Sequence, residues 1–492
     1  MVKMKVILIN PTSKFIKSHR IYRQFLAPIP PLGLAYIAAV LEKEGVCVEL
    51  IDMFAGRISQ EDVVKRILTV KPDIVGFSVL TPVLADVKLL VQEVKDRGIK
   101  TNIVLGNTHA SCFSTELLNC GCADIVVRGE GELAMAELCR ALVNGADLSN
   151  IKGISYISDG KVHHNEGGNI VEDLDSLPYP AFRLLDLNHY REFPMNSVRG
   201  GRFLPIGASR GCPYDCYFCA QDTINKKVRY RKMKQVVDEI EYMHTKLQVK
   251  YFGFTDAYFP FSESTGLEFC EHMVSRGLHK KIKWFTENRV DKVNRNLLLK
   301  MKEAGLHQIM YGIETGSQEV LDKINKKTTI AQAREAVKYT KEAKILSLGL
   351  YVLGLPGETR EQREETIRFA KELDTDIAKF NIIIPYPGSQ FFNDQVAHDR
   401  IDDPEKYSSW YSTFCFDFGI TNHRQLIELQ RRAMVAYYFR PNVIFRFFKM
   451  GIASYKNIFF GASWLCSMVF FSILEKPYML LKRIFIRVNS GS

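Results

Sequence analysis

Three cysteines near the middle of the chain stand close enough together to bind one inorganic cluster. Cys212, Cys216 and Cys219 fall within eight residues, at C-x₃-C-x₂-C spacing. Thiolates on one short loop can bind a single iron–sulfur cube, and such a cube ordinarily takes four cysteines. With three local ligands one iron stays open, and an open metal position is where a substrate or cofactor binds. The alternatives are buried structural cysteines or part of a zinc site, but zinc cysteines usually form two C-x₂-C pairs and the sequence has no second pair.

This spacing, with the aromatic Phe218 before the last cysteine, resembles the signature of the radical S-adenosylmethionine (SAM) enzymes. The resemblance implies a [4Fe–4S] cluster whose open iron binds the amino and carboxylate groups of SAM. It also implies a SAM-derived 5′-deoxyadenosyl radical that removes a hydrogen atom from the substrate, and an electron donor of the flavodoxin or ferredoxin type. Phe218 would pack near the adenine. The cofactors would supply the difficult chemistry, and the protein would position them and exclude water.

Six short apolar runs that alternate with helical patterns position the cysteine motif. They are Leu204–Ala208, Tyr251–Thr255, Lys283–Thr286, Gln308–Ile313, Ser347–Leu353 and Lys379–Pro385. Six βα units predict a partial (β/α)₆ barrel of the TIM type, in which active groups lie at the carboxyl ends of the strands. The motif directly follows the first run, so we expect the cluster in the mouth of the barrel.

Chemically useful residues follow the other runs as well. The resemblance assigns six of them to SAM: Asp256, Glu287, Arg289, Glu314, Gly354 and Pro356. Asp256 would receive the amino group, since a carboxylate facing an ammonium makes a strong hydrogen bond. Glu287 and Arg289 would contact the carboxylate and ribose, and the Gly354–Glu358 block would lie beside the adenine. Taken singly, each could be a surface charge or a turn; their order at successive strand ends favours a site.

The first 148 residues show a separate alternation of strands and helices. Apolar runs lie at 5–10, 46–53, 74–80, 102–105 and 124–128, with helical patterns at 34–44, 61–70, 84–97 and 132–144. This order predicts a doubly wound, Rossmann-like parallel sheet covered on both faces. Ligands of such sheets bind beyond the carboxyl ends of the strands. The pattern alone fits a generic domain of this kind equally well.

Three blocks in this region, Pro30–Ala38, Gly106–Ala110 and Arg128–Glu132, together resemble the cobalamin-binding domain of class B radical SAM enzymes. The resemblance assigns these residues to cobalamin: Asn10, Pro31, Gly33, Ser78, Thr81, Gly106, His109, Gly129 and Glu130. The D-x-H-x-x-G motif that supplies a histidine to cobalt is absent. We therefore expect cobalamin without a histidine ligand, and His109 as a wall or hydrogen-bonding residue. Asn107 and Thr108 replace the Gly and Pro that are usual beside this histidine.

The chain is predicted to divide into four parts. A cobalamin-binding domain (1–148) is followed by a hairpin and linker (149–198), the barrel (199–395) and a helical C-terminal region (396–492). Aromatic residues between Trp410 and Phe418 could line a hydrophobic substrate pocket or belong to the core. The net charge is +11, and +9 of it lies in residues 421–492, beside aromatic and aliphatic runs. This placement favours an anionic membrane surface over nucleic acid.

The run Ile458–Leu474 is almost uncharged, but a spanning helix needs about 20 apolar residues. We expect it to lie on the inner membrane face; the alternative is a helical subdomain packed on the barrel. The N-terminus carries no secretory signal and the eleven cysteines form no disulfide pattern. A cytoplasmic protein, peripheral on the inner membrane face, is expected.

As a whole the sequence resembles the cobalamin-dependent radical SAM enzymes that modify hopanoids, tetrapyrroles and other hydrophobic molecules. The first expectation is C-methylation of an unactivated carbon of a hydrophobic or lipid substrate, in which one SAM methylates the cobalamin and a second gives the radical. Radical ring formation, contraction or oxidation in the same architecture is the alternative. A non-catalytic cobalamin sensor or carrier is the alternative of another class. A methylthiotransferase would carry three further cluster cysteines and an RNA-binding tail, and neither is apparent.

Overall fold

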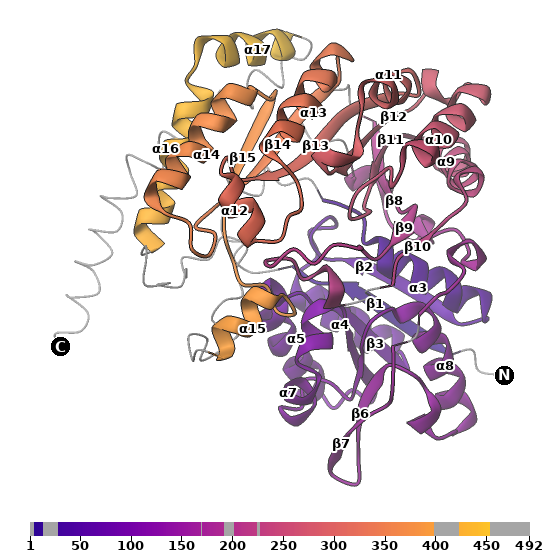
Figure 1. The fold of residues 1–492 in the computed structure, drawn as a ribbon. Helices are drawn as coiled ribbons and strands as arrows, with labels where there is room; N and C mark the ends of the chain where they lie inside the picture. The colour runs from indigo at the N-terminus through magenta and orange to yellow at the C-terminus, as the bar shows by residue number, and fades with distance from the viewer. Residues whose placement is uncertain are drawn as a thin grey trace.

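The computed structural model describes residues 4–12, 28–168, 170–190, 201–223, 227–397 and 423–452. Figure 1 shows two α/β bodies stacked on each other, the N-terminal one coloured indigo to purple and the second magenta to orange. Each is built around one main sheet, of seven strands in the first and six in the second. The fold class expected from the sequence is confirmed.

The N-terminal sheet has the order β2-β1-β3-β4-β5-β6-β7. Its strands are β1 (Lys5–Asn10), β2 (Cys47–Asp52), β3 (Ile74–Ser78), β4 (Asn102–Gly106), β5 (Ile125–Val127), β6 (Ile154–Ser158) and β7 (Lys161–His164). The first five are parallel, and β6 and β7 pair antiparallel. The hairpin expected in the linker therefore extends this sheet, because β6 pairs with the edge strand β5.

Helices cover both faces of this sheet. They are α3 (Leu32–Lys43), α4 (Gln60–Val70), α5 (Leu84–Asp96), α6 (Thr108–Cys112), α7 (Ser114–Asn119) and α8 (Gly131–Asn144). Strand β1 is apolar throughout its centre because Val6 and Leu8 pack into the core under α3 and α8, whereas Ile7 and Ile9 pack under α4 and α5. The predicted strands and long helices are confirmed; the short helices α6 and α7 were not predicted.

The second sheet contains six parallel strands in the order β15-β14-β13-β12-β11-β8. They are β8 (Arg202–Ile206), β11 (Val249–Phe254), β12 (Lys283–Asn288), β13 (Leu306–Glu314), β14 (Leu346–Leu353) and β15 (Ile377–Ile382). The accompanying helices are α9 (Met233–Leu247), α10 (Glu263–Ser275), α11 (Arg295–Glu303), α12 (Gln318–Lys323), α13 (Ile330–Glu342), α14 (Arg360–Leu373) and α15 (Gln390–Ala397). A two-stranded ribbon, β9 (Ser209–Arg210) and β10 (Arg229–Tyr230), begins directly after β8.

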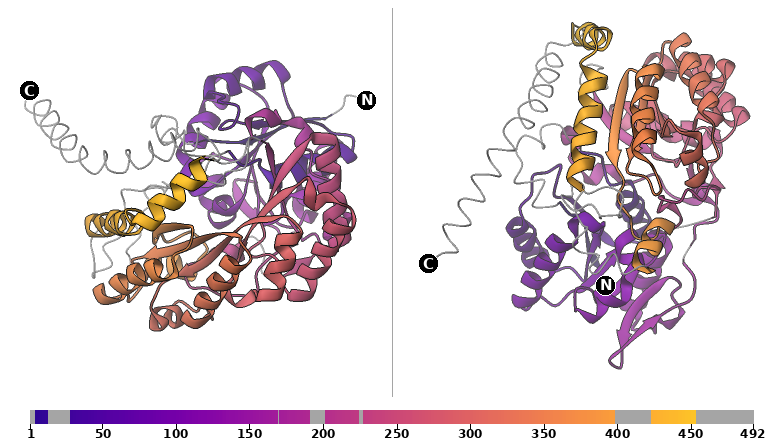
Figure 2. Two further views of the ribbon diagram at one scale, coloured as in Figure 1. Left: turned by 90° about the horizontal axis from the view of Figure 1, so that it is seen from above. Right: turned by 60° about the vertical axis from the view of Figure 1, so that its left-hand side comes forward.

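Two C-terminal helices, α16 (His423–Tyr438) and α17 (Pro441–Ile452), lie at the outer edge of the barrel (Figure 2). Helix α16 is fixed to β15 by the Tyr438 hydroxyl, which donates to the carbonyl of Ala378 at 2.7 Å. No helix of the described chain is long and apolar enough to cross a membrane. The aromatic segment 410–418 and the run 458–474 lie outside the described residues.

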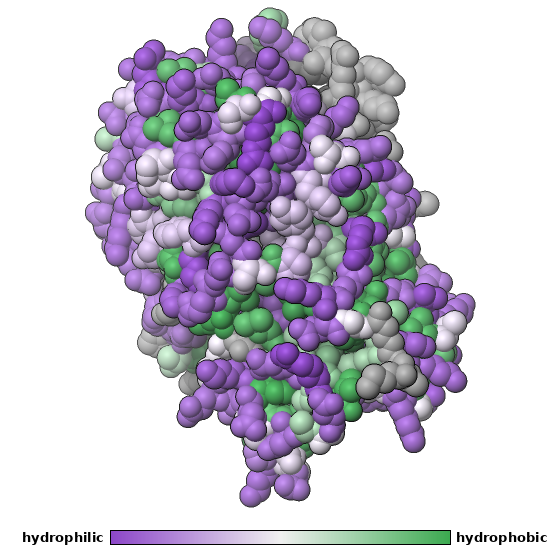
Figure 3. All heavy atoms as spheres, turned by 90° about the vertical axis from the view of Figure 1, so that its right-hand side faces the viewer, coloured by the Kyte–Doolittle hydropathy of each residue, from purple (hydrophilic) through white to green (hydrophobic). Residues whose placement is uncertain are grey.

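The two bodies share part of one hydrophobic core, which runs from α3 and α8 through the linker to α9. Several hydrogen bonds join the linker to the first domain. Among them, the Ala181 amide donates to the Ala35 carbonyl at 2.9 Å, and the Tyr190 hydroxyl donates to Asp52 Oδ2 at 2.8 Å. On the face in Figure 3 hydrophilic residues predominate and hydrophobic ones form separate groups. The domains therefore pack on each other through buried contacts, not through the linker alone.

Candidate active site between the two domains

The cysteine loop leaves the first barrel strand through β9 and returns through β10. Gly211 begins it with φ +86°, and a Cβ at this position would lie 2.5 Å from the carbonyl oxygen of Lys227, so only glycine fits. Burial raises the pKa of Cys216, and raises that of Cys219 to about 11. Cys212 and Cys216 both act electrostatically on Cys219, so the three sulfurs share one neighbourhood.

The donor set of this loop, three cysteine thiols, is the kind that an iron–sulfur cluster takes. In the described part of the chain no three His, Cys, Asp or Glu side chains are arranged around one metal ion. In a cube the cysteines bind different irons, so they need not converge on one point. A neutral thiol becomes a thiolate when it coordinates a metal. The prediction that Cys212, Cys216 and Cys219 hold a [4Fe–4S] cluster thus agrees with the donor chemistry.

Residues from three barrel elements hold the loop in place. The Arg289 guanidinium, at the end of β12, lies 3.6 Å from the ring centroid of Tyr214. The Tyr217 amide donates to the Ile324 carbonyl at 3.0 Å, and its hydroxyl donates to Asp394 of α15 at 2.6 Å. The neighbouring Phe218 ring packs, half-buried, on the apolar cluster of α12, β14 and α15. Contacts within the protein therefore hold the loop in place.

A buried ion pair stands beside the cysteines. Lys326 Nζ lies 2.5 Å from Glu314 Oε1, with side-chain exposures of 10% and 8%. Burial lowers the pKa of Lys326, but the charges of Glu314 and Cys216 outweigh it and leave the pKa raised. The ammonium therefore stays charged near Cys216, a predicted cluster ligand. Lys326 was not predicted as a site residue, because nothing in the sequence separates it from the exposed neighbour Lys327.

Two predicted SAM residues at the end of β12 have different surroundings. Burial, followed by the charge of Glu314, raises the pKa of Glu287. Arg289 is already committed to protein groups: its Nε donates to Asp291 at 2.8 Å and its Nη2 donates to the Lys326 carbonyl at 2.9 Å. The structure thus places Glu287 and Glu314 together in the barrel mouth. Arg289 lies in the same region but supports the two loops that surround it.

Asp256, at the end of β11, is buried against the start of the cysteine loop. Its carboxylate accepts hydrogen bonds from the Ala208 amide at 3.1 Å and from Ser209 Oγ at 2.6 Å. Burial raises the pKa of Asp256 to about 6. The observed bonds fix the backbone that enters the cysteine loop. Contact with the SAM amino group stays a prediction.

The Gly354–Glu358 block forms a tight turn after β14. Gly354 has φ +83°, and its amide donates to Glu358 Oε2 at 2.8 Å. Burial raises the pKa of Glu358 to about 7. Pro356 is half-buried within this turn. The block therefore has the rigid geometry expected of a binding loop, and its contact with adenine stays a prediction.

In the N-terminal domain, the strand order reverses between β1 and β3, which is where open α/β sheets bind ligands. Asn10, Ser78 and Gly106 end β1, β3 and β4, so the structure brings them to one edge. Asn107 Nδ2 donates to Ser78 Oγ at 2.9 Å. Asn107 itself has φ +79° and ψ −176°, a conformation that strains any residue but glycine.

His109 and Thr81 complete this polar edge. Thr81 Oγ1 and His109 Nδ1 are 3.1 Å apart. Burial, reinforced by the charge of Lys88, lowers the pKa of His109 to about 4, so the imidazole is neutral at physiological pH. Its helix, α6, contacts the turn Gln221–Thr223, which begins two residues after Cys219. The polar edge formed by the ends of β1, β3 and β4, called the N-terminal crevice from here on, therefore adjoins the cysteine loop.

The remaining predicted cobalamin residues divide into two groups. Pro31 and Gly33 begin α3, and a Cβ at Gly33 would meet no atom within 4 Å, which leaves open space for a ligand. Gly129 has φ +83° and its amide donates to Ser111 Oγ at 3.2 Å. Glu130 points away toward the barrel, where its carboxylate binds Arg229 Nη2 at 2.5 Å. Its contact with cobalamin stays a prediction.

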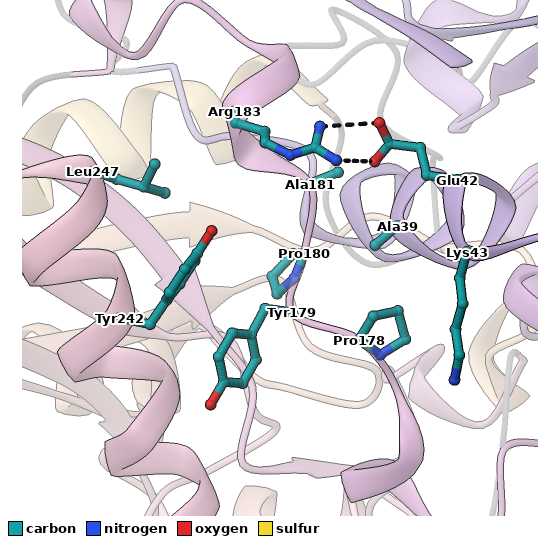
Figure 4. Close-up of a pocket in the computed structure, with 10 residues that line it drawn as sticks. All are labelled: Ala39, Glu42, Lys43, Pro178, Tyr179, Pro180, Ala181, Arg183, Tyr242 and Leu247. Carbon is teal, nitrogen blue, oxygen red and sulfur yellow. Dashed lines mark hydrogen bonds and ion pairs between the residues drawn. The ribbon is translucent and has the colours of Figure 1, made fainter. Parts of the chain in front are cut away.

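A separate cavity of about 360 Å³ lies between α3, the linker and α9 (Figure 4). None of the predicted site residues lines it. Arg183 of the linker and Glu42 of α3 form a two-pronged ion pair at its edge, with N–O distances of 2.9 and 2.6 Å. This cavity marks the outer side of the domain contact, not the cofactor site.

Comparisons with known proteins agree with this division. Residues 206–370 match the model of the radical SAM superfamily, and residues 21–139 match that of the B12 binding domain. The chain is 33% identical to an uncharacterized methyltransferase of Pyrococcus horikoshii over 451 residues, 90% of this chain and 94% of that one. It is also 33% identical to the anaerobic magnesium-protoporphyrin IX monomethyl ester cyclase of Rubrivivax gelatinosus, over 77% of this chain and 68% of that one.

Among solved structures, the radical SAM methyltransferase TsrM of Kitasatospora setae superposes with a TM-score of 0.68 at 18% identity, covering 88% of this chain and 89% of that chain. This likeness confirms the fold. The cofactors of the two matched domains are a [4Fe–4S] cluster, SAM and cobalamin, and the cysteine loop, barrel mouth and β1/β3 crevice provide fitting places for them. The non-catalytic alternative is not supported. The chain belongs to the radical SAM enzymes that carry a B12-binding domain.

Proposed function

We propose that this enzyme methylates an unactivated carbon of a hydrophobic substrate. The observation that carries the proposal is the contact between the two sites: α6, with His109, packs on the turn that follows Cys219. A methyl donor and a radical generator must both reach one substrate carbon, so they must lie side by side. The full-length relative named a methyltransferase supports this choice.

When bound, the cluster and SAM supply a radical that removes hydrogen, and cobalamin supplies the methyl group. The residues of the chain bind and orient these groups. Lys326 and Glu314 form a dry, charged wall that suits the ammonium and carboxylate ends of SAM. The neutral His109, Thr81 and Asn107 form a hydrogen-bonding wall that suits the amide-rich rim of cobalamin. No described residue is assigned as a general acid or base.

Ring formation or oxidation is the second candidate. The observation that favours it is the 33% identity to a cyclase that acts on a magnesium porphyrin ester. Both reactions begin with removal of hydrogen by the same radical, so the barrel mouth serves either. The two differ in whether a methyl group is delivered afterwards.

Product mass separates the two candidates. The full chain, purified without oxygen and reconstituted with iron and cobalamin, is incubated with methyl-deuterated SAM, a reductant and the lipids that co-purify with it. Methylation adds one labelled methyl group to the product. A product that instead loses two hydrogens and carries no label would overturn methylation in favour of ring formation or oxidation. Cys216→Ala is the control that should give neither product.

We further propose a reduced flavodoxin or ferredoxin as the electron donor.

We also propose that the enzyme is cytoplasmic and touches the membrane through its C-terminal region. Phe445 of α17 is 68% exposed, and Ile444 and Phe439 are 48% and 49% exposed. The basic surplus of residues 421–492 would favour anionic lipid. Flotation of the full chain with phosphatidylglycerol vesicles, but not with phosphatidylcholine vesicles, is expected; Phe445→Ser should weaken it. Equal flotation with both lipids, or with neither, would contradict the proposal.

A further inference from the structure

The stem of the cysteine loop is joined to the B12-binding domain by buried ion pairs. We propose that Glu130 is a positioning residue that locks this stem onto the B12-binding domain and so fixes the cluster loop relative to the cobalamin crevice. This role goes beyond the proposed function, because it holds whether the reaction is methylation or ring formation.

The stem places two arginines side by side. In the ribbon of β9 and β10, Arg210 and Arg229 are directly opposed partners. Like charges in directly opposed positions destabilise a pair of strands unless an anion lies between them. Glu130 is that anion: its Oε1 lies 2.5 Å from Arg229 Nη2, and its Oε2 lies 3.0 Å from Arg229 Nη1 and 3.3 Å from Arg210 Nη1. The ribbon therefore depends on a residue of the other domain.

The ion pairs of Glu130 with Arg229 and Arg210 are largely shielded from solvent. Glu130 and Arg229 side chains are 4% and 5% exposed, and Arg210 is 23% exposed. Burial by itself would raise the pKa of Glu130, but the Arg229 hydrogen bond and the Arg210 charge leave it lowered. Charge-assisted, two-pronged pairs of this kind fix direction as well as distance. A flexible surface contact would not.

Glu130 also binds the linker. Its Oε2 accepts a hydrogen bond from the Val171 amide at 2.9 Å, and the Val171 carbonyl accepts from Arg229 Nη1. One carboxylate, carried by the segment after β5, thus contacts two others: the linker and the loop stem. A second acid, Glu132, pairs with Arg210 at 2.6 Å. Arg210 and Arg229, which flank the cysteine loop, therefore both form ion pairs with the B12-binding domain.

Arg231, directly after the end of β10, continues the attachment toward the barrel. Arg231 Nη1 lies 2.7 Å from Glu239 of α9, and its Nε lies 3.4 Å from Asp175 of the linker. Tyr36 of α3 lies 3.4 Å from Arg231 through its hydroxyl. The stem is thus held on both sides, by the barrel and by the B12-binding domain. Its position therefore depends on how the two domains are arranged.

The test compares two interdomain carboxylates of the full chain. Glu130→Gln removes the buried charge while it keeps the shape of the side chain. Glu42→Gln is the matched control, because Glu42 forms a two-pronged pair with Arg183 across the same interface but at the exposed side of the molecule. Hydrogen exchange of the chain without cofactors is measured in the stem and, as an internal reference, in β1 and β3.

We expect exchange in the stem to rise about tenfold or more in Glu130→Gln, as for the loss of one charge-assisted bond, with β1 and β3 unchanged. Glu42→Gln should match the wild type. In the reconstituted protein, the magnetic coupling between the reduced cluster and cob(II)alamin should become weaker or more heterogeneous only in Glu130→Gln. These readouts do not depend on which product forms, so they can fail while the proposed function holds.

Unchanged stem exchange and unchanged coupling in Glu130→Gln would overturn the proposal, as would an equal effect of Glu42→Gln. If Glu130→Gln unfolds the whole first domain, Arg229→Lys is the second variant, since it keeps the charge and loses the fork. It should loosen the stem while the first domain stays folded. Hydrogen exchange in the stem of Arg229→Lys equal to that of the wild type would then overturn the proposal.

Discussion

The barrel mouth and the N-terminal crevice lie next to each other, yet their chemistry differs. The barrel mouth holds formal charges: Lys326 pairs with Glu314 at 2.5 Å, and Glu287 lies within reach of both. The crevice holds neutral groups: Ser78, Thr81 and a His109 that burial keeps unprotonated. Charged walls suit a zwitterion such as SAM, whereas neutral donors and acceptors suit the amides of a corrin.

The two regions are also stabilised differently. In the barrel mouth the buried Lys326 and Glu314 lie side by side with opposite charges, because either charge alone would be costly to desolvate. In the crevice polar groups form ordinary hydrogen bonds with one another, and one residue, Asn107, is held in a strained conformation. Substitutions should therefore cause large losses in the first region and graded ones in the second.

The largest effect is expected from Cys216→Ala. Loss of one of three cluster ligands should abolish cluster assembly and SAM cleavage, because no other described residue can replace the thiolate. Cobalamin binding to the N-terminal crevice should remain measurable, since its residues lie in the other domain. Iron and cobalt counts on the anaerobic protein check both statements. Loss of both cofactors together would show that the regions are not independent.

Lys326→Met should come next. It leaves Glu314 buried without its partner, which should cost about 3–5 kcal/mol of stability and weaken SAM binding. Urea unfolding and equilibrium dialysis with SAM measure the two effects. Lys327→Met, at the exposed neighbouring position, is the control and should change stability by less than about 0.5 kcal/mol. Similar unfolding midpoints for the two variants would contradict the role given to Lys326.

The His109 imidazole should give the crevice a pH dependence of stability. Burial lowers its pKa to about 4 in the folded protein, against about 6.5 in an unfolded chain. Between these values only the unfolded chain takes up the proton, so stability falls as pH drops, by roughly 3 kcal/mol over the whole interval. Urea unfolding of wild type and His109→Gln across this interval checks it. Parallel pH profiles would show that another group is responsible.

Asn107→Gly should have the smallest effect. Glycine adopts φ +79° without strain, a gain of about 1–3 kcal/mol, but the substitution removes the bond to Ser78 and the cap of α6, worth about 1 kcal/mol each. Stability should therefore change little while cobalamin binding weakens. Thermal unfolding and cobalamin titration measure both. A loss above about 2 kcal/mol would mean that Asn107 is not strained in the folded protein.

Much of the fold could be predicted from periodicity. Strands β1 to β5, β8 and β11 to β15 fall on the apolar runs, because parallel strands buried on both faces read as continuous hydrophobic segments. The two-residue strands β9 and β10 were not predicted. The helices α6 and α7 could not be predicted, since they have only five and six residues and carry no amphipathic period. The hairpin β6–β7 was predicted correctly as a hairpin, but its pairing with β5 is a long-range contact.

The candidate site shows the same division. Cys212, Cys216 and Cys219 could be named from the sequence, because three metal ligands on one loop need only local spacing. Lys326 could not, because its importance comes from its pairing with Glu314, twelve residues earlier, and from its electrostatic interaction with Cys216.

The sequence by itself determined the cysteine spacing that carries the resemblance to radical SAM enzymes and the alternation of strands and helices, since both depend on local spacing and hydrophobic period. Only the tertiary structure decided which charges meet. Glu130 follows a strand end like its neighbours in the crevice, yet it binds Arg229, 99 residues away, in the other domain. Burial makes such a pairing decisive, and burial is a property of the packed chain.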